Sequence, residues 1–270
     1  MSKTRLDVLL TQRGLVESRE RAKALIMSGN VFVAGNRADK PGMQVCSDAV
    51  IDVKDLPEYV SRGGQKLEKA LDVFGVLPEG KVCIDCGAST GGFTDCLLKK
   101  GAGLVYAVDV GYGQLAWNLR NDPRVITMER TNIRHVTADM FDKRPEIAVI
   151  DVSFISLSLV LPVVYGLLTD GGEALCLIKP QFEAGRGSVG KKGVVRDPET
   201  HKSVLEAFVL YSAQSGFTVK AITHSPVKGP EGNIEFLGWL SKLSEERFPD
   251  PGKNIDVGVI VAQAHQELLP

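Results

Sequence analysis

The pattern of apolar and polar positions changes partway along the chain. Near the N-terminus, residues 5–13 and 18–28 have the spacing of two short amphipathic helices. Short runs of β-branched and aromatic residues, separated by Gly and Asn, follow as far as Val53 and predict small strands. We therefore expect a small α+β domain over residues 1–55, followed by a linker over residues 56–60.

From residue 61 to residue 270, apolar strands alternate with helical patterns. We place strands near residues 81–86, 104–109, 124–128, 146–151, 173–178, 217–223, 234–240 and 257–262. We place helices near residues 62–75, 91–100, 113–120, 156–168 and 199–215. Alternating β and α units of this length predict an α/β, Rossmann-like domain over residues 61–270, with a doubly wound sheet. In such a domain, ligands bind beyond the carboxyl ends of the strands.

The composition is that of a globular protein with a near-neutral charge. Hydrophobic residues make up 44% of the 270 residues, charged residues make up 24%, and the net charge is −1. This balance excludes a uniformly basic surface, so any nucleic-acid binding requires local basic patches. The first forty residues hold eight basic and four acidic residues, and Arg19 and Lys23 share one helical face. That face can hold phosphates, although a plain solvated helix surface has the same charge pattern.

Membrane, export and metal signals are absent from the sequence pattern. No run reaches the roughly 18–20 apolar residues of a membrane span, and the N-terminus lacks a signal peptide, so we expect a cytoplasmic protein. Five cysteines, an odd number, argue against a disulfide framework. Cys83 and Cys86 match C-x-x-C, but they lie on a predicted strand where positions three apart face opposite sides. No second pair or nearby His completes a site, so we predict no metal.

A glycine-rich turn links the first strand of the larger domain to a helix. It reads Asp85-Cys86-Gly87-Ala88-Ser89-Thr90-Gly91-Gly92-Phe93, and Ser89 stands where a dinucleotide fingerprint has its middle Gly. This turn favours a ligand without a pyrophosphate, such as S-adenosylmethionine, over a purely structural turn. Asp109, at the end of the second strand, is suited to accept hydrogen bonds from ribose hydroxyls. The predicted cofactor-binding residues are Asp85, Gly87, Ser89, Gly91, Phe93, Asp109 and Asn132.

Three later segments carry charged side chains where strands end or begin. Asp151 follows the fourth strand, Lys179 follows the fifth, and Glu235 lies among apolar neighbours. Taken singly, each has an alternative interpretation as a solvent-facing charge at the edge of a sheet. All three at one crevice would be typical of a catalytic site.

The N-terminal motifs resemble an S4 domain. The matching positions are Arg5-Leu6-Asp7, Gly14-Leu15, Ser18-Arg19, Ala22, Ile26, Gly29, Val31, Val33 and Gly35. The resemblance covers roughly residues 4–55. It implies binding of structured RNA through the face formed by the two helices.

The whole chain resembles the TlyA family of rRNA 2′-O-ribose methyltransferases, often named haemolysin A. The motifs are Ser61-Arg62-Gly63-Gly64-Gln65-Lys66-Leu67, the glycine-rich turn continued to Thr94, Asp151-Val152-Ser153-Phe154-Ile155-Ser156, Lys179-Pro180-Gln181-Phe182-Glu183 and Glu231-Gly232-Asn233-Ile234-Glu235. The family joins an S4 domain to a domain similar to the FtsJ/RrmJ methyltransferases. Tyr59 occupies the linker position where the family usually has a bulky aromatic residue.

The resemblance implies a catalytic Lys-Asp-Lys-Glu tetrad. The four positions fall on Lys66, Asp151, Lys179 and Glu235, with Lys69 as a competitor for the first role. Within the tetrad, Lys179 would orient or deprotonate the ribose hydroxyl. For Lys179 to act as a base, burial and a cationic neighbour such as Lys66 must lower its pKa, while the two carboxylates act in the opposite sense. The sequence leaves that balance open.

RNA contacts are expected from both domains. Residues 183–197 are rich in Gly and basic residues and directly follow Lys179, which favours a mobile RNA-facing loop over a plain solvated one. The predicted RNA-binding residues are Arg5, Arg19, Lys23, Arg62, Arg186, Lys191, Lys192 and Arg196.

Other functions compete with ribose methylation. One is a non-enzymatic ribosome-binding factor, against which the intact tetrad positions argue. Another is a pore-forming haemolysin, which the α/β pattern disfavours. A third is base methylation, whose enzymes more often carry an Asn/Asp-Pro-Pro-Tyr motif that this sequence lacks. The implied substrates are cytidines of small-subunit rRNA, large-subunit rRNA or both, free or within ribosomal subunits.

Overall fold

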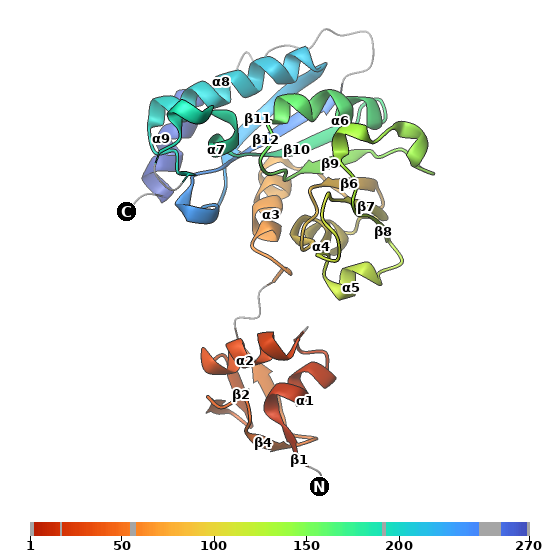
Figure 1. Cartoon of the computed structure of the whole chain (residues 1–270), viewed down its shortest axis with the longest axis vertical. Helices are drawn as coiled ribbons and strands as arrows, with labels where there is room; N and C mark the ends of the chain where they lie inside the picture. The colour runs from red at the N-terminus through yellow and green to blue at the C-terminus, as the bar shows by residue number, and fades with distance from the viewer. Residues whose placement is uncertain (1–2, 17, 55–57, 191–192, 243–254, 269–270) are drawn as a thin grey trace. The chain divides into compact units, whose positions relative to one another are not determined.

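The structure, a computed structural model, describes residues 3–16, 18–54, 58–190, 193–242 and 255–268. The chain divides into two compact units, Met1–Glu58 and Tyr59–Pro270 (Figure 1). Each unit has its own hydrophobic core. The division falls within the linker expected at residues 56–60.

The N-terminal unit packs two helices against short strands. Strand β1 (Lys3–Arg5) pairs antiparallel with β4 (Gln44–Cys46), and β2 (Val31–Val33) lies between β3 (Asn36–Ala38) and β5 (Ile51–Val53). The helices are α1 (Leu6–Gln12) and α2 (Arg19–Met27). Their apolar stripes form the core, which includes Leu6, Leu9, Leu10, Ala22, Leu25 and Ile26. The predicted helices were therefore correct to within one or two residues.

Two local signals shape this unit. The Ser18 side chain accepts a hydrogen bond from the backbone N–H of Arg21 at 3.2 Å and so caps the N-terminus of α2. A two-residue turn, Ala34-Gly35, joins β2 to β3. Ala34 and Gly35 both have positive φ, so the chain reverses before Asn36, which already begins β3.

The larger unit is built on a seven-stranded sheet with the order β11-β12-β10-β9-β6-β7-β8. Its strands are β6 (Val82–Cys86), β7 (Leu104–Val108), β8 (Val125–Met128), β9 (Ile147–Ile150), β10 (Glu173–Ile178), β11 (Phe217–His224) and β12 (Phe236–Lys242). The five strands from β10 to β8 are parallel, and β12 is antiparallel to both of its neighbours. The chain runs outward from β6 to β8 and then returns to β9 on the other side of β6. The carboxyl ends of β6 and β9 therefore form the switch point at which such sheets bind ligands.

Helices cover both faces of this sheet (Figure 1). One core contains residues of α6 (Leu161–Leu167), α8 (Pro198–Gln214) and α9 (Val257–Leu268). The other contains residues of α3 (Gly63–Phe74), α4 (Gly92–Lys99) and α5 (Trp117–Arg120). Short helical turns complete the unit: α7 (Pro180–Glu183) and the 3₁₀ turns Ile133–His135, Ala138–Met140, Leu157–Leu159, Arg186–Ser188 and Pro230–Gly232. The Rossmann-like α/β architecture with a doubly wound sheet, which the sequence predicted, is confirmed.

The prediction of a strand at residues 257–262 was wrong. These residues form the first part of α9, and Val261 and Ala264 are its buried positions. The β-branched run misled the assignment, because a short apolar run has the same pattern in a buried strand and in a helix. The Asp256 side chain accepts a hydrogen bond from the backbone N–H of Val259 at 3.0 Å, so an N-terminal helix signal was present.

Three other element boundaries also differ from expectation. Of the helix expected at residues 113–120, only Trp117–Arg120 is helical. The helix expected at residues 156–168 is divided into a 3₁₀ turn and α6, with Pro162 in the first turn of α6. The last sheet strand begins at Phe236 and not at 234, which leaves Glu235 on the connection that enters β12.

Candidate active site

The turn after β6 adopts a backbone conformation that requires its glycines. Gly87 has φ +92, and a Cβ there would lie 2.5 Å from the backbone oxygen of Asp151. Gly91, at the start of α4, has φ +96, and Ser89 between them also has a positive φ of 50. The turn thereby brings the end of β6 against the end of β9. Gly87 and Ser89 line the cavities described below, whereas Gly91 does not.

Asp85 lies beneath this turn and not in a cavity wall. Its carboxylate is completely buried, and Oδ2 accepts a hydrogen bond from the Thr94 hydroxyl at 2.7 Å. Burial raises the pKa of Asp85 to about 7, against the lowering effect of the Thr94 hydrogen bond, and the charges of Asp151 and Asp109 raise it further. Asp85 therefore supports the turn from below. Its carboxylate lines neither cavity, so this structure gives a cofactor no direct access to it.

Asp109 follows β7 and is held by two backbone groups. Its Oδ2 accepts a hydrogen bond from the N–H of Ser89 at 2.7 Å, and its Oδ1 accepts one from the N–H of Gly111 at 2.6 Å. Each carboxylate oxygen keeps a second lone pair for a ligand. The Asn132 side chain, in turn, accepts a hydrogen bond from the N–H of Arg134 at 3.1 Å and caps the following 3₁₀ turn.

Asp109 and Asn132 line the larger of two neighbouring cavities, with a volume of about 770 Å³. Its wall combines apolar Val108, Val110, Ile133 and Leu159 with polar groups from the ends of β6, β7 and β9. The smaller cavity, of about 230 Å³, is lined by Phe93 and by residues that include Ser61, Arg62, Thr90 and all four members of the predicted tetrad. Gly87, Ser89 and Asp151 line both cavities, so the two meet at the carboxyl ends of β6 and β9.

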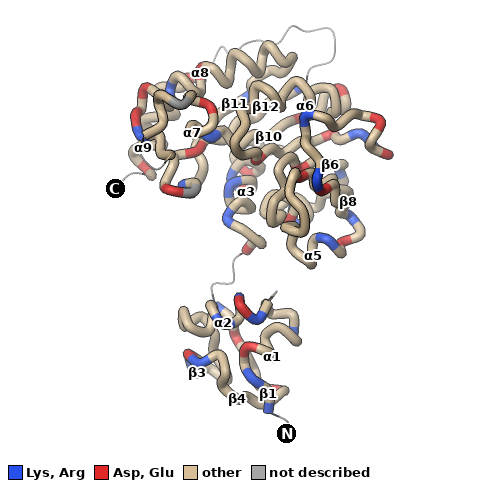
Figure 2. The backbone as a smooth tube through the Cα atoms, in the orientation of Figure 1, with Lys and Arg blue, Asp and Glu red and all other residues tan. Residues whose placement is uncertain are grey.

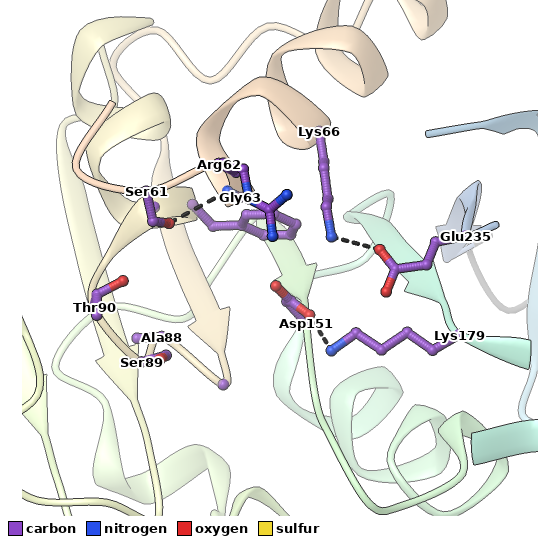
Figure 3. Close-up of a pocket in the computed structure, with 13 residues that line it drawn as sticks. Ser61, Arg62, Gly63, Lys66, Ala88, Ser89, Thr90, Asp151, Lys179 and Glu235 are labelled. Atoms are coloured by element: carbon purple, nitrogen blue, oxygen red, sulfur yellow. Dashed lines mark hydrogen bonds and ion pairs between the residues drawn. The ribbon is translucent and has the colours of Figure 1, made fainter. Parts of the chain in front are cut away.

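The four tetrad residues come together from four separate elements (Figure 3). Lys66 on α3 forms a short ion pair with Glu235, and Lys179 after β10 lies 2.5 Å from Asp151 Oδ1. Glu235 is completely buried, and both lysines are nearly so. Buried charges of this kind require partners, and each cation here has a facing carboxylate. The competitor Lys69 lies one helical turn away, 3.4 Å from His224 Nδ1, and lines neither cavity.

The Lys179 ammonium group has two hydrogen-bond acceptors and one ion-pair partner. Besides Asp151, its Nζ lies 3.0 Å from the backbone oxygen of Val152 and 3.0 Å from Ser153 Oγ. An ammonium group has N–H donors and no lone pair, so two hydrogen bonds and a facing carboxylate suit its charged form. This geometry favours an orienting, charge-stabilising lysine over a lysine that acts as a base.

The segment that follows Asp151 carries a feature that sequence analysis missed. Phe154 has a positive φ of 63, and its side chain is 90% exposed. Both properties are unusual for a large aromatic residue and are typical of functional sites. Hydrogen bonds also hold the end of this segment, at Ser156 and Leu157. Glu183 accepts one from the Ser156 hydroxyl at 2.6 Å and one from the N–H of Leu157 at 2.8 Å. The signal in the sequence was an aromatic residue directly after the polar end of a strand.

The predicted RNA-binding residues have varied environments. Arg5 Nε and Arg19 Nη2 lie 3.0 and 3.1 Å from the buried carboxylate of Asp7, so both arginines help to build the N-terminal unit. Hydrogen bonds from Arg5 and then Arg19 hold the pKa of Asp7 well below its ordinary value. Their sequence positions predicted RNA contact only, and the exposed half of each side chain leaves room for such a contact.

The remaining basic residues are distributed over both units (Figure 2). Lys23 is half-buried on α2, Arg196 is exposed before α8, and Arg62 is exposed and lines the smaller cavity. The backbone of Arg186 lies in a 3₁₀ turn. Lys191 and Lys192 lie outside the described residues.

Comparisons with known proteins agree with this architecture. Residues 59–242 match the FtsJ-like methyltransferases, and residues 4–51 match the S4 domain. YqxC of Bacillus subtilis (strain 168), named as a candidate rRNA methyltransferase, is 53% identical over 98% of this chain and 95% of its own length. The 16S/23S rRNA (cytidine-2′-O)-methyltransferase TlyA of Mycobacterium tuberculosis (strain H37Rv) is 44% identical over 93% of this chain and 94% of its own.

A solved structure also covers nearly the whole chain. A candidate hemolysin from Streptococcus thermophilus aligns with a TM-score of 0.75 at 48% identity, over 99% of this chain and 97% of the other. The word hemolysin is the name given to the Streptococcus thermophilus protein and describes no observation on this chain. In the described part of this chain, no helix is long and apolar enough to cross a membrane. Together, the sequence matches, the S4 domain and the sheet order place this chain in the FtsJ-like methyltransferase family, among its TlyA members.

Proposed function

We propose that this protein transfers a methyl group from S-adenosylmethionine to the ribose 2′-hydroxyl of cytidines in ribosomal RNA. The observation that carries the proposal is the pair of lysine–carboxylate contacts, Lys66 with Glu235 and Lys179 with Asp151, beside a cavity of nucleoside size. The S4 domain supports an RNA substrate, and the names of the relatives support ribosomal RNA. A protein that acts on this substrate belongs in the cytoplasm, which is the location that we propose.

The two cavities fit S-adenosylmethionine in size and chemistry. The larger volume, about 770 Å³, falls within the range of small-molecule sites. The fixed carboxylate of Asp109 would accept hydrogen bonds from the ribose hydroxyls, and Val110 and Ile133 offer apolar surface to the adenine. Ser89 and Phe93, in the smaller cavity, would hold the methionine portion. When bound, the cofactor supplies an electrophilic methyl group on a positively charged sulfur.

Lys179 would orient the ribose oxygen and stabilise its developing charge. A ribose hydroxyl is a weak nucleophile, so holding it in line with the methyl group contributes much of the rate. The ammonium group can exchange one of its backbone or hydroxyl acceptors for the ribose oxygen while it keeps its ion pair with Asp151. A preorganised cation at this position stabilises negative charge more strongly than water does.

Lys66 and Glu235 would form the second wall of the ribose site. Glu235 Oε2 contacts Lys66, and Oε1 is buried without a hydrogen-bond partner in the described part of the chain. Gly229 packs directly against this oxygen, because a Cβ there would lie 2.1 Å from it. An unsatisfied buried acceptor favours a ligand hydroxyl that completes it.

The test is transfer of a labelled methyl group from S-adenosylmethionine to ribosomal subunits that lack the modification. We expect label in a ribose that resists alkaline cleavage. We expect Lys179→Ala to slow transfer by about 100-fold or more, since loss of one charge-stabilising donor has an effect of that order. Lys69→Ala is the matched control, because Lys69 is a lysine of the same domain outside both cavities, and we expect it to retain the rate.

The labelled subunit identifies the substrate as small-subunit RNA, large-subunit RNA or both. Full transfer by Lys179→Ala, with unchanged cofactor affinity by calorimetry, would contradict the role of this lysine. Absence of label with wild-type protein that binds both cofactor and RNA would instead favour a non-enzymatic ribosome-binding factor.

A further inference from the structure

The hydroxyl of Ser153 lies beside Lys179, where the two cavities meet. Ser153 is exposed, lines the larger cavity, and has its Oγ 3.0 Å from Lys179 Nζ. Lys179 itself lines the smaller cavity. The contact between Ser153 and Lys179 therefore joins the walls of the two cavities, beside Asp151, which lines both.

The position of this contact matters because methyl transfer has to take place where the two cavities meet. The adenosine and methionine portions of the proposed cofactor occupy different cavities, so its sulfur lies near their shared wall. Gly87, Ser89 and Asp151 form that wall. Of the shared residues, Gly87 has no side chain, Asp151 already pairs with Lys179, and Ser89 is assigned above to the methionine portion of the cofactor. Ser153 adds a hydroxyl group next to this pair.

The hydrogen-bond arrangement leaves the Ser153 proton available. Lys179 donates to Ser153 Oγ, so that contact uses a lone pair of the oxygen and not its hydrogen. In the described part of the chain, that contact is the one hydrogen bond of the Ser153 side chain. Since Ser153 is exposed, its O–H can donate to water in the cavity while its second lone pair accepts from a ligand.

Lys179 cannot easily take the ribose proton itself. Its ammonium group already donates hydrogen bonds to Val152 and Ser153, forms an ion pair with Asp151, and has no lone pair. The ribose hydroxyl must nevertheless lose a proton when its oxygen is methylated. A neighbouring neutral hydroxyl in contact with solvent can receive that proton and release its own.

We propose that Ser153 is a further catalytic residue, whose hydroxyl contacts the ribose 2′-oxygen of the target nucleotide and carries its proton to solvent. The ribose oxygen bonds to the methyl carbon as the carbon–sulfur bond breaks, and that electron pair stays on sulfur. The ribose proton passes to Ser153 Oγ, and the original Ser153 proton passes to a water molecule. Lys179 remains an ammonium group throughout. This inference rests on the proposed function and extends it.

The neighbouring contacts hold Ser153 in place for this role. Before it, Asp151 and Val152 are bound to Lys179, and after it, Ser156 and Leu157 are bound to Glu183. A segment held on both sides keeps the hydroxyl near the reacting atoms without help from substrate.

A binding experiment tests the contact without relying on turnover. Two versions of an rRNA fragment are compared by equilibrium binding in the presence of S-adenosylhomocysteine: one with a 2′-hydroxyl at the target nucleotide and one with 2′-deoxyribose there. We expect the deoxy substitution to weaken binding to wild-type protein by about 5-fold, the effect of one hydrogen bond. We expect less than about a 2-fold difference with Ser153→Ala, because the partner hydroxyl is gone. Equal losses in both proteins would overturn the proposal.

Single-turnover rates test the proton transfer. With saturating cofactor and RNA, we expect Ser153→Ala to be slower by about 10- to 100-fold, and Ser153→Thr, which keeps the hydroxyl, to retain most of the rate. Ser158→Ala is the matched control, because its hydroxyl bonds to Ser156 at 2.9 Å and lines neither cavity. A wild-type rate for Ser153→Ala would overturn the inference and leave the proposed function intact. Absence of transfer by the wild-type protein would overturn both.

Discussion

At the scale of single residues, the space around a glycine separates positions that require glycine from positions that merely favour it. Gly87 combines φ +92 with a close approach to the backbone of Asp151. Gly75, the C-cap of α3, has φ +69 but open space around its Cα. Both glycines resist substitution through strain, and Gly87 has a steric clash in addition. The two positions form a natural matched pair.

Gly87→Ala should abolish measurable cofactor binding, whereas Gly75→Ala should leave it unchanged. The added methyl group at position 87 forces apart the ends of β6 and β9, on which both cavities depend. At position 75 we expect a loss of about 1 kcal/mol in the free energy of unfolding, from left-handed strain alone. Calorimetric titration with S-adenosylmethionine and thermal unfolding measure the two effects. Comparable cofactor affinity in the two variants would contradict this account of the turn.

Asp85 gives a prediction about pH. Its folded pKa of about 7 is raised by burial above the ordinary value of 3.8, so the native state binds more protons than the unfolded state between these values. The free energy of unfolding should therefore fall as the pH rises from about 4 to about 7, through this group. Asp85→Asn keeps an acceptor for the Thr94 hydroxyl and removes the titration. We expect the variant to be more stable than wild type at pH 8, with a smaller advantage at pH 5.

Denaturant unfolding at several pH values checks this expectation. Asp95→Asn is the control. Asp95 is also a buried carboxylate, on α4, but its Oδ2 forms an ion pair with Lys99 at 3.0 Å. A difference between Asp85→Asn and wild type that stays constant with pH would show that Asp85 does not titrate in this range.

At the scale of elements, periodicity predicted most of the sheet and the helices α3 and α8 of the larger unit. It failed where a short apolar run is ambiguous, as at Val257–Val261, and where tertiary contacts set a boundary, as at Trp117. Asp151, Lys179 and Glu235 were noticed as charges beside strands, whereas Lys66 and the grouping of all four came from the resemblance to the TlyA family. Phe154 and Ser153 were not singled out, because their importance comes from exposure and hydrogen bonding that periodicity does not report.

The hydrogen bonds that Glu183 of α7 accepts from the segment after β9 can be tested by substitution. Glu183→Ala removes the acceptor of the Ser156 hydroxyl and the Leu157 N–H. The loss of a buried acceptor costs about 1–3 kcal/mol locally, so we expect faster amide exchange at Leu157 and weaker cofactor binding. Glu183→Gln keeps one acceptor oxygen and should lie between wild type and Glu183→Ala. Unchanged exchange at Leu157 in Glu183→Ala would mean that other contacts hold this segment.

At the scale of the whole molecule, a net charge of −1 means that RNA affinity depends on where the cations lie. Lys23 belongs to the N-terminal unit and Arg196 to the larger unit, and both lie outside the two cavities. If both units contact one RNA, each neutralisation removes one phosphate contact and its released counterion. Lys23→Gln and Arg196→Gln should then each reduce the slope of log affinity against log salt by about 0.7, and together by about 1.4.

Equilibrium binding of ribosomal RNA at several salt concentrations measures this slope, with cofactor affinity as the control that should not change. Lys220→Gln is the matched surface control, since this exposed lysine on β11 is not among the predicted RNA contacts. A smaller salt slope for Arg196→Gln but not for Lys23→Gln would assign RNA binding to the larger unit alone. A reduction for both would mean that the S4 domain and the methyltransferase domain engage the same RNA, so that the S4 domain contributes affinity while the tetrad selects the ribose.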